Sequence, residues 1–270
     1  MQNRRNAALQ GCLAFFIFFS ATPAFAQPPQ PVVAPAPAGP EFLPRFDFHM
    51  DATHLAIGNE RFSWDTYFGG SFDVLDYVSG RLGVRADYEA VLGDELRPFD
   101  ANQATYMLEW SVSGRLGART EFAGIFHHVS RHLSDRPKPN AIAWNEIGGR
   151  LIHRASIGTT TIDVDLEGGR VVQHSSIDYR WIGDARLLIC QPVHDRVSLF
   201  ALGSGEAIGV DETVNRRGTQ IGGLVEGGVR IIARGAALEL YAGYERRIDA
   251  YPIGFTSQHW GLAGFRLLSR

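Results

Sequence analysis

Hydrophobic and polar residues alternate with a period of two along most of the chain from Phe46 onward. In the stretch 81–92, one face is charged at Arg81, Arg85, Asp87 and Glu89. The opposite face of this stretch is apolar, with Leu82, Val84, Ala86, Tyr88, Ala90 and Leu92. Because successive side chains of a β-strand point to opposite faces, the pattern predicts strands whose two faces meet different surroundings.

Segments with this alternation recur to the end of the chain. Counting them predicts about twelve strands, with bounds accurate to a few residues. The predicted strands are 45–57, 63–77, 81–93, 104–116, 119–130, 143–157, 160–173, 177–190, 196–209, 218–233, 237–249 and 257–268. Most of them are long enough to cross a bilayer at a tilt.

The predicted connections alternate between short and long. Short ones at 78–80 and 234–235 alternate with longer ones at 94–103, 131–142 and 210–217. Bacterial outer-membrane barrels have short periplasmic turns and longer external loops. The predicted fold class is therefore all-β, a transmembrane antiparallel β-barrel of about 12 strands in the outer membrane of a Gram-negative cell.

A soluble barrel or sandwich is the alternative fold, because alternation alone does not say which face points inward. Aromatic residues on the apolar face near strand ends favour the membrane barrel, since they match an interfacial girdle. These residues are Phe46, Phe48, Phe68, Trp110, Trp181, Tyr244 and Trp260. In the membrane barrel the charged face, including Arg150 and Arg180, lines the lumen, and acid–base pairs between neighbouring strands are expected largely to block it.

The beginning of the chain has the layout of a secretory signal peptide. Arg4 and Arg5 precede an apolar stretch at 12–19 that is too short to span a membrane, and small residues follow at positions 24 and 26. The sequence thus predicts a signal peptide at 1–26, a proline-rich, disordered periplasmic segment at 27–42 and an outer-membrane β-barrel at 43–270. Removal of the signal peptide would leave Cys190 as the only cysteine, so no internal disulfide is expected.

The net charge of the chain argues against one class of binding partner. The formal net charge is −3 at pH 7, which argues against binding to nucleic acid. The expected partners are outer-membrane lipids and the barrel-assembly machinery, and a homodimer is an alternative that the sequence leaves open.

The stretch FHHVSRHLSDRPKPNAIAWNE, residues 126–146, concentrates the residue types of hydrolase active sites. His128 and Ser130 share the apolar, outward face of one predicted strand, and Asn145 shares that of the next. An antiparallel hairpin brings the three residues within reach of one another. A serine hydroxyl becomes a nucleophile when an imidazole takes its proton, and a third polar group orients the imidazole.

This arrangement resembles two families of membrane-embedded barrel lipases. The twelve-stranded outer-membrane phospholipases A have a His-x-Ser pair and, after a loop, a Trp-Asn pair; both occur here, at 128–130 and 144–145. The lipid A deacylases are smaller barrels with His-x-Ser and a downstream glutamate. The resemblance implies hydrolysis of phospholipid or lipid A acyl esters, with Ser130 as nucleophile, His128 as base, Asn145 as the orienting residue and calcium as a cofactor.

The sequence also departs from that resemblance. Arg131 and His132 stand where the phospholipases have Asn-Gly. The wider block His-x-Ser-x-His-Leu-x-Asp, which ends at Asp135, resembles outer-membrane barrels of unknown role. A non-catalytic barrel with a structural, narrow-channel or surface-interaction role is therefore the alternative function, with the histidines and the serine as interfacial residues.

A divalent metal site is a third hypothesis for the same stretch. His132 and Asp135 would be its ligands, with His127 and His128 nearby, if the following loop folded back. However, His127 and His128 are consecutive in a predicted strand and point to opposite faces, which weakens the cluster.

Overall fold

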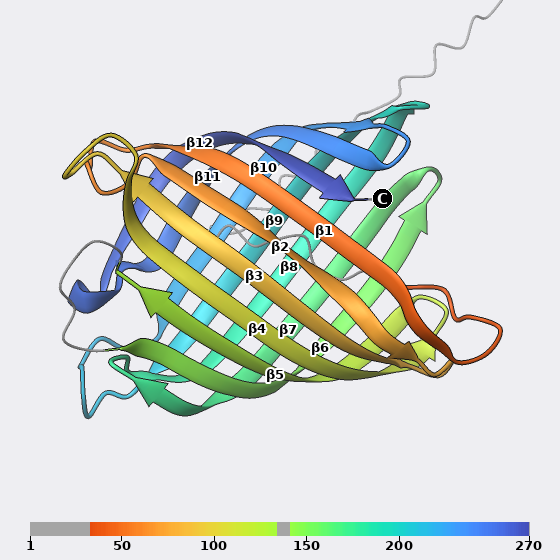
Figure 1. Ribbon diagram of the computed structural model, residues 1–270, viewed down its shortest axis with the longest axis horizontal. Helices are drawn as coiled ribbons and strands as arrows, with labels where there is room; N and C mark the ends of the chain where they lie inside the picture. Colours follow the sequence, from red (N-terminus) through yellow and green to blue (C-terminus); the bar gives the residue numbers. More distant parts are fainter. Residues whose placement is uncertain (1–32, 134–140, 270) are drawn as a thin grey trace, which may run out of the picture.

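The computed structural model of the chain describes residues 33–133 and 141–269. These residues form twelve antiparallel strands that close into one barrel (Figure 1), as predicted. The strands are β1 (Glu41–Ala56), β2 (Trp64–Asp76), β3 (Arg81–Gly93), β4 (Asp100–Gly117), β5 (Thr120–His132), β6 (Ile142–Ile157), β7 (Thr160–Ser175), β8 (Tyr179–His194), β9 (Val197–Val210), β10 (Gln220–Ile232), β11 (Ala236–Tyr251) and β12 (Thr256–Ser269).

The barrel closes where its first strand meets its last. β1, orange in Figure 1, runs beside β12, dark blue, and the register extends from His49 opposite Leu268 to Ala56 opposite Gly261. Every other strand pairs with its neighbours in the sequence. Closure satisfies the backbone hydrogen bonds that an open sheet edge would leave exposed to lipid.

The two rims of the barrel differ in the length of their connections. One rim carries 77–80, 118–119, 158–159, 195–196 and 233–235. The other carries 57–63, 94–99, 133–141, 176–178, 211–219 and 252–255, the last of which contains the 3-10 helix η1 (Pro252–Gly254). Among the described residues, no helix has the length and hydropathy needed to cross a membrane.

The outer wall is apolar, and most of the predicted aromatic girdle lies on it. Phe46, Phe68 and Trp110 are 66%, 51% and 43% exposed. Trp260 is an exception, because its side chain is only 2% exposed and its indole Nε1 donates a hydrogen bond to Glu245 Oε2 at 2.9 Å. It lies an even number of residues from the inward-facing Arg266, so it shares the interior face and not the predicted outer one.

Charged residues of both signs fill the interior. The guanidinium of Arg247 on β11 bonds the carboxylates of Glu89 on β3, Asp65 on β2 and Glu245 on its own strand. Arg150 bonds Glu109 at 2.6 Å and also bonds Glu167. These contacts join strands across the lumen and between neighbours, as the sequence predicts for Arg150.

Arg180 does not line the lumen, contrary to the prediction. The register of β8 and β9 shifts between Tyr179 and Trp181, so the inward-facing positions change there. Arg180 therefore lies at the rim and bonds Asp211 at 2.6 Å. Hydrogen bonds from Thr213 and then from Arg180 lower the pKa of Asp211 to about 2, which keeps this rim pair charged in any neutral medium.

We expect the rim with the longer connections to face outward from the cell. Trypsin added to intact cells should then cleave after Arg216, which is exposed in the connection 211–219, and spare Arg119 and Arg234 on the opposite rim. Permeabilising the outer membrane should open the latter two sites to cleavage. Mass spectrometry of the fragments measures this, and cleavage after Arg119 or Arg234 in intact cells would show the opposite orientation.

Arg266 is expected to stabilise the closing seam, since it bonds Asp51 on β1, Glu226 on β10 and Glu239 on β11. Arg266→Ala should lower the free energy of unfolding by about 3–5 kcal/mol, because it leaves buried carboxylates without their partner. The exposed Arg180→Ala is the control and should change little. Denaturant unfolding in lipid vesicles provides the comparison, and equal midpoints for the two variants would contradict this role.

Candidate active site on the outer wall

The outward face of β5 carries the candidate residues near the rim with the longer connections. His128 and Ser130 lie on this face, whereas Val129 and Arg131 between and after them are buried inside the barrel. Asn145 lies on the outward face of β6, directly opposite His128 in the strand register. The structure therefore places all three predicted residues on the same wall.

His128 and Asn145 form the central contact of the site. The Nδ1 atom of His128 lies 2.6 Å from Oδ1 of Asn145. Asn145 uses its Nδ2 group to donate to Oε1 of Gln173 on β7, at 2.9 Å. Because the Asn145 oxygen can only accept, Nδ1 of His128 donates this hydrogen bond, and in the neutral imidazole Nε2 then has a free lone pair. An imidazole held in this tautomer is ready to act as a base.

The hydroxyl of Ser130 has a partner that the sequence did not indicate. Its Oγ lies 3.2 Å from Nε2 of His132, two residues along the same face of β5. The ring of His132 packs edge-on against Tyr106 of β4, with centroids 5.4 Å apart. In the described residues, Ser130 thus lies between two outward histidines and bonds His132. The spacing of His132 from Ser130 was the signal in the sequence that could have suggested this contact.

Gln173 reaches the outer wall through an irregularity in β7. Asn145 pairs with Gln173, yet the next residue, Glu146, pairs with Val171, so Val172 is an extra residue in β7. Such a bulge changes which side chains point outward, and bulges occur often beside functional sites. No pattern of residue types marks this bulge, so Gln173 could not have been found from the sequence.

Aromatic rings line the wall beside Ser130. Phe68, Tyr88, Tyr106 and His132 follow one another on β2, β3, β4 and β5, with neighbouring centroids 4.9, 5.0 and 5.4 Å apart. Rings in such contact stabilise one another and suit the membrane interface. The outer wall beside Ser130 is therefore largely aromatic.

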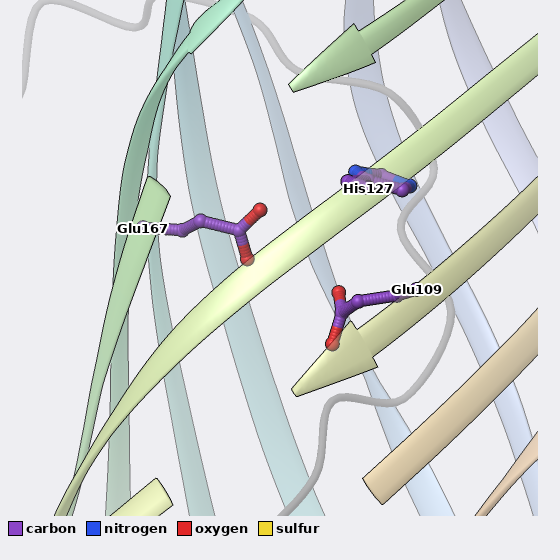
Figure 2. Close-up of side chains that lie close together, drawn as sticks. All are labelled: Glu109, His127 and Glu167. Carbon is purple, nitrogen blue, oxygen red and sulfur yellow. The ribbon is translucent and has the colours of Figure 1, made fainter. Parts of the chain in front are cut away.

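The structure describes only some residues of the predicted metal site. His132 contacts Ser130 and Tyr106, and Asp135 lies outside the described residues. His127 points into the barrel, toward Glu109 and Glu167 (Figure 2), and so takes no part in a cluster on the outer wall. The pairing of His132 with Asp135 around an ion stays a prediction.

Comparisons with known proteins connect this chain to others by fold. No family model matches the sequence, and no curated protein was found as a relative. Outer membrane phospholipase A from Escherichia coli is similar in structure, with 14% identity over 83% of this chain and 92% of that one, at a TM-score of 0.50. An active-site mutant of that enzyme, in which an asparagine is replaced by alanine, gives 15% identity over 85% and 91%, at a TM-score of 0.51.

A dimer of the Salmonella typhi outer membrane phospholipase with bound calcium has 14% identity over 83% of this chain and 90% of that one, at a TM-score of 0.49. At these identities the likeness concerns the fold. The closed barrel, its apolar outer wall and its neighbours together show that the chain is an outer-membrane β-barrel.

Proposed function

We propose that this barrel hydrolyses acyl esters of outer-membrane lipids, with Ser130 as nucleophile, His128 as base and Asn145 as the orienting residue. The observation that carries the proposal is the hydrogen bond between Asn145 and His128, on a lipid-facing wall and two residues from Ser130. An asparagine is also an active-site residue in the Escherichia coli phospholipase. Phospholipids and lipid A are the substrate classes that meet this surface.

The proposed reaction begins with a rotation of the Ser130 side chain. In this proposal the hydroxyl of the partly buried Ser130 turns from His132 toward Nε2 of His128 by a change between staggered rotamers. Nε2 then takes the hydroxyl proton while Oγ attacks the acyl carbonyl carbon. The imidazolium, held by Asn145, gives the proton to the departing alcohol, which leaves the acyl group on Ser130. Water, deprotonated by His128, then attacks this acyl group and releases the fatty acid, and the proton returns to Oγ of Ser130.

Gln173 and His132 have supporting roles in this proposal. Gln173 holds the amide of Asn145 so that its oxygen faces His128. Before the reaction His132 forms a hydrogen bond with the hydroxyl of Ser130, and the rotation of Ser130 breaks this bond. Arg131 cannot stabilise the oxyanion on the outer wall, because its side chain is buried inside and bonds Thr105 at 3.3 Å.

The contact between Ser130 and His132 also favours a second candidate function. A barrel in which these residues are interfacial polar groups, with a structural or surface-interaction role, would show the same hydrogen bond. The two functions differ in a direct way, since only the hydrolase releases fatty acid. The same assay measures whether calcium or dimer formation changes the rate of fatty-acid release.

Loss of the nucleophile is expected to abolish hydrolysis. Ser130→Ala should lower fatty-acid release from mixed phospholipid micelles by at least about 1,000-fold, and Asn145→Ala by a smaller factor of about 10 to 100. Ser175→Ala, at an exposed serine on β7, is the matched control and should keep full activity. The assay is run with and without calcium on refolded protein. Equal release by the unaltered protein and Ser130→Ala, or none from either, would leave the barrel non-catalytic.

The two histidines beside Ser130 are expected to differ in effect. His128→Ala should match the loss seen with Ser130→Ala, because the base and the nucleophile act as one unit. His132→Ala should retain most activity, since it frees the hydroxyl for His128. The exposed His174→Ala controls for the loss of a rim histidine. If His132→Ala is inactive and His128→Ala is not, the base is His132 and Asn145 has another role.

A further inference from the structure

A cavity of about 110 Å³ lies inside the barrel, behind the outer-wall site. Eight carboxylates and four arginines line it. Carboxylates in a low-dielectric interior need compensation by arginines, by protons or by a bound cation. The lining therefore favours a positively charged ligand, and the side chains on β4 to β7 provide the most closely grouped ligand atoms.

Three side chains in this cavity bring metal-ligating atoms together. Glu109 on β4, His127 on β5 and Glu167 on β7 each offer an atom within 4.8 Å of the other two. Figure 2 shows the two carboxylates directed toward the same space, with the imidazole beside them. Ligand atoms at about 2.1 Å from one ion lie at most about 4.2 Å apart. Small side-chain rotations would thus close this group onto an ion.

Glu146 supplies an independent indication of a missing ligand. Its side chain is 2% exposed, yet its Oε1 atom has no hydrogen-bond partner within the described residues. It lies opposite His127 in the register of β5 and β6 and close enough for its charge to interact with that of Glu167. Gly169 makes room for it, because a Cβ there would lie 2.3 Å from the unpartnered oxygen.

Arg150 compensates only part of the negative charge. It bonds both oxygens of Glu109, at 2.7 and 2.6 Å, and one oxygen of Glu167, at 2.7 Å from Nε. The bonded oxygen of Glu167 accepts from both Nε and Nη2 of Arg150, whereas its second oxygen remains available and each oxygen of Glu109 keeps another lone pair. Glu109, Glu146 and Glu167 carry three negative charges when ionised against the single positive charge of Arg150. A divalent cation would balance the remaining two.

Other charged groups of the cavity add to this excess of negative charge, since the charge of Asp184 also acts on Glu146. Asp165, 3.7 Å from Nε of Arg150, lies opposite Arg186 in the register of β7 and β8. Arg85 bonds Asp87 at 2.6 Å. Asp87 is thus paired with Arg85, whereas Asp165 shares Arg150 with Glu109 and Glu167.

We infer that Glu109, His127 and Glu167 bind a divalent transition cation, with the carboxylate of Glu146 as a further ligand. Mixed imidazole and carboxylate ligands suit zinc, manganese and related ions. The ion would join β4, β5, β6 and β7 from inside the barrel. This site is separate from the outer wall, since His127 and the proposed base His128 point to opposite faces of β5.

The test uses purified, refolded full-length protein that has been stripped with a chelator and then titrated with Zn²⁺ by calorimetry. One ion per chain should bind, and the unfolding temperature should rise with zinc because the ion binds the folded state. His127→Gln and Glu146→Gln should each weaken zinc binding by at least about 10-fold. His153→Gln, which removes an outer-wall histidine, should bind zinc as the unaltered protein does.

Folding of each variant is checked by its heat-dependent mobility in detergent gels. Glu146→Gln preserves the size of the side chain and removes only its charge, so it remains informative if His127→Gln does not fold. No zinc binding by the unaltered protein, or unchanged affinity in the folded variants at 127 and 146, overturns the inference. Weakened binding in His153→Gln alone would likewise overturn it, because the ion would then lie on the outer wall.

Discussion

Arginine–carboxylate bonds inside the barrel are the interactions on which the rest of the structure depends. A membrane barrel exposes its outward apolar side chains to lipid, so paired polar groups inside it stabilise the fold together with the two buried apolar clusters around Trp260 and Trp144. Arg247 joins β11 to β3 and β2, Arg266 joins β12 to β1 and β10, and Arg150 joins β6 to β4 and β7. Each guanidinium offers several donors in a fixed plane, which suits it to bond carboxylates from more than one strand.

This interior gives the outer wall a rigid support. Side chains on a strand are positioned more precisely than those on a loop. On the interior side, Arg150 and its carboxylates stabilise the strands that carry the candidate site. On β5, consecutive residues serve the two sides: His127 points to the acidic cavity and His128 to the lipid. A single strand therefore contributes to two chemically unrelated environments, separated by the thickness of one sheet.

The candidate active site combines a prearranged part and an adjustable part. The chain of hydrogen bonds from Gln173 through Asn145 to His128 determines the tautomer of the imidazole. Ser130, by contrast, has an imidazole on either side of it along the strand and bonds His132. In the proposed reaction the hydroxyl of Ser130 changes partner by rotation about one bond.

Alternation along the chain was enough to predict the twelve strands, the closed barrel, its charged interior and the shared outward face of His128, Ser130 and Asn145. These features follow from the period-two geometry of strands, which is local and appears directly in the residue pattern. The same pattern also indicated that Arg150 would pair inside, because neighbouring strands present opposite charges there.

Only the tertiary structure decided the features that depend on register. Bulges near Arg180 and at Val172 change which side chains point inward, so Arg180 moved to the rim and Gln173 to the outer wall. The bond from Ser130 to His132 likewise depends on the choice of side-chain rotamer. Bulges and rotamers result from packing between segments, and the residue pattern of one strand contains no record of them.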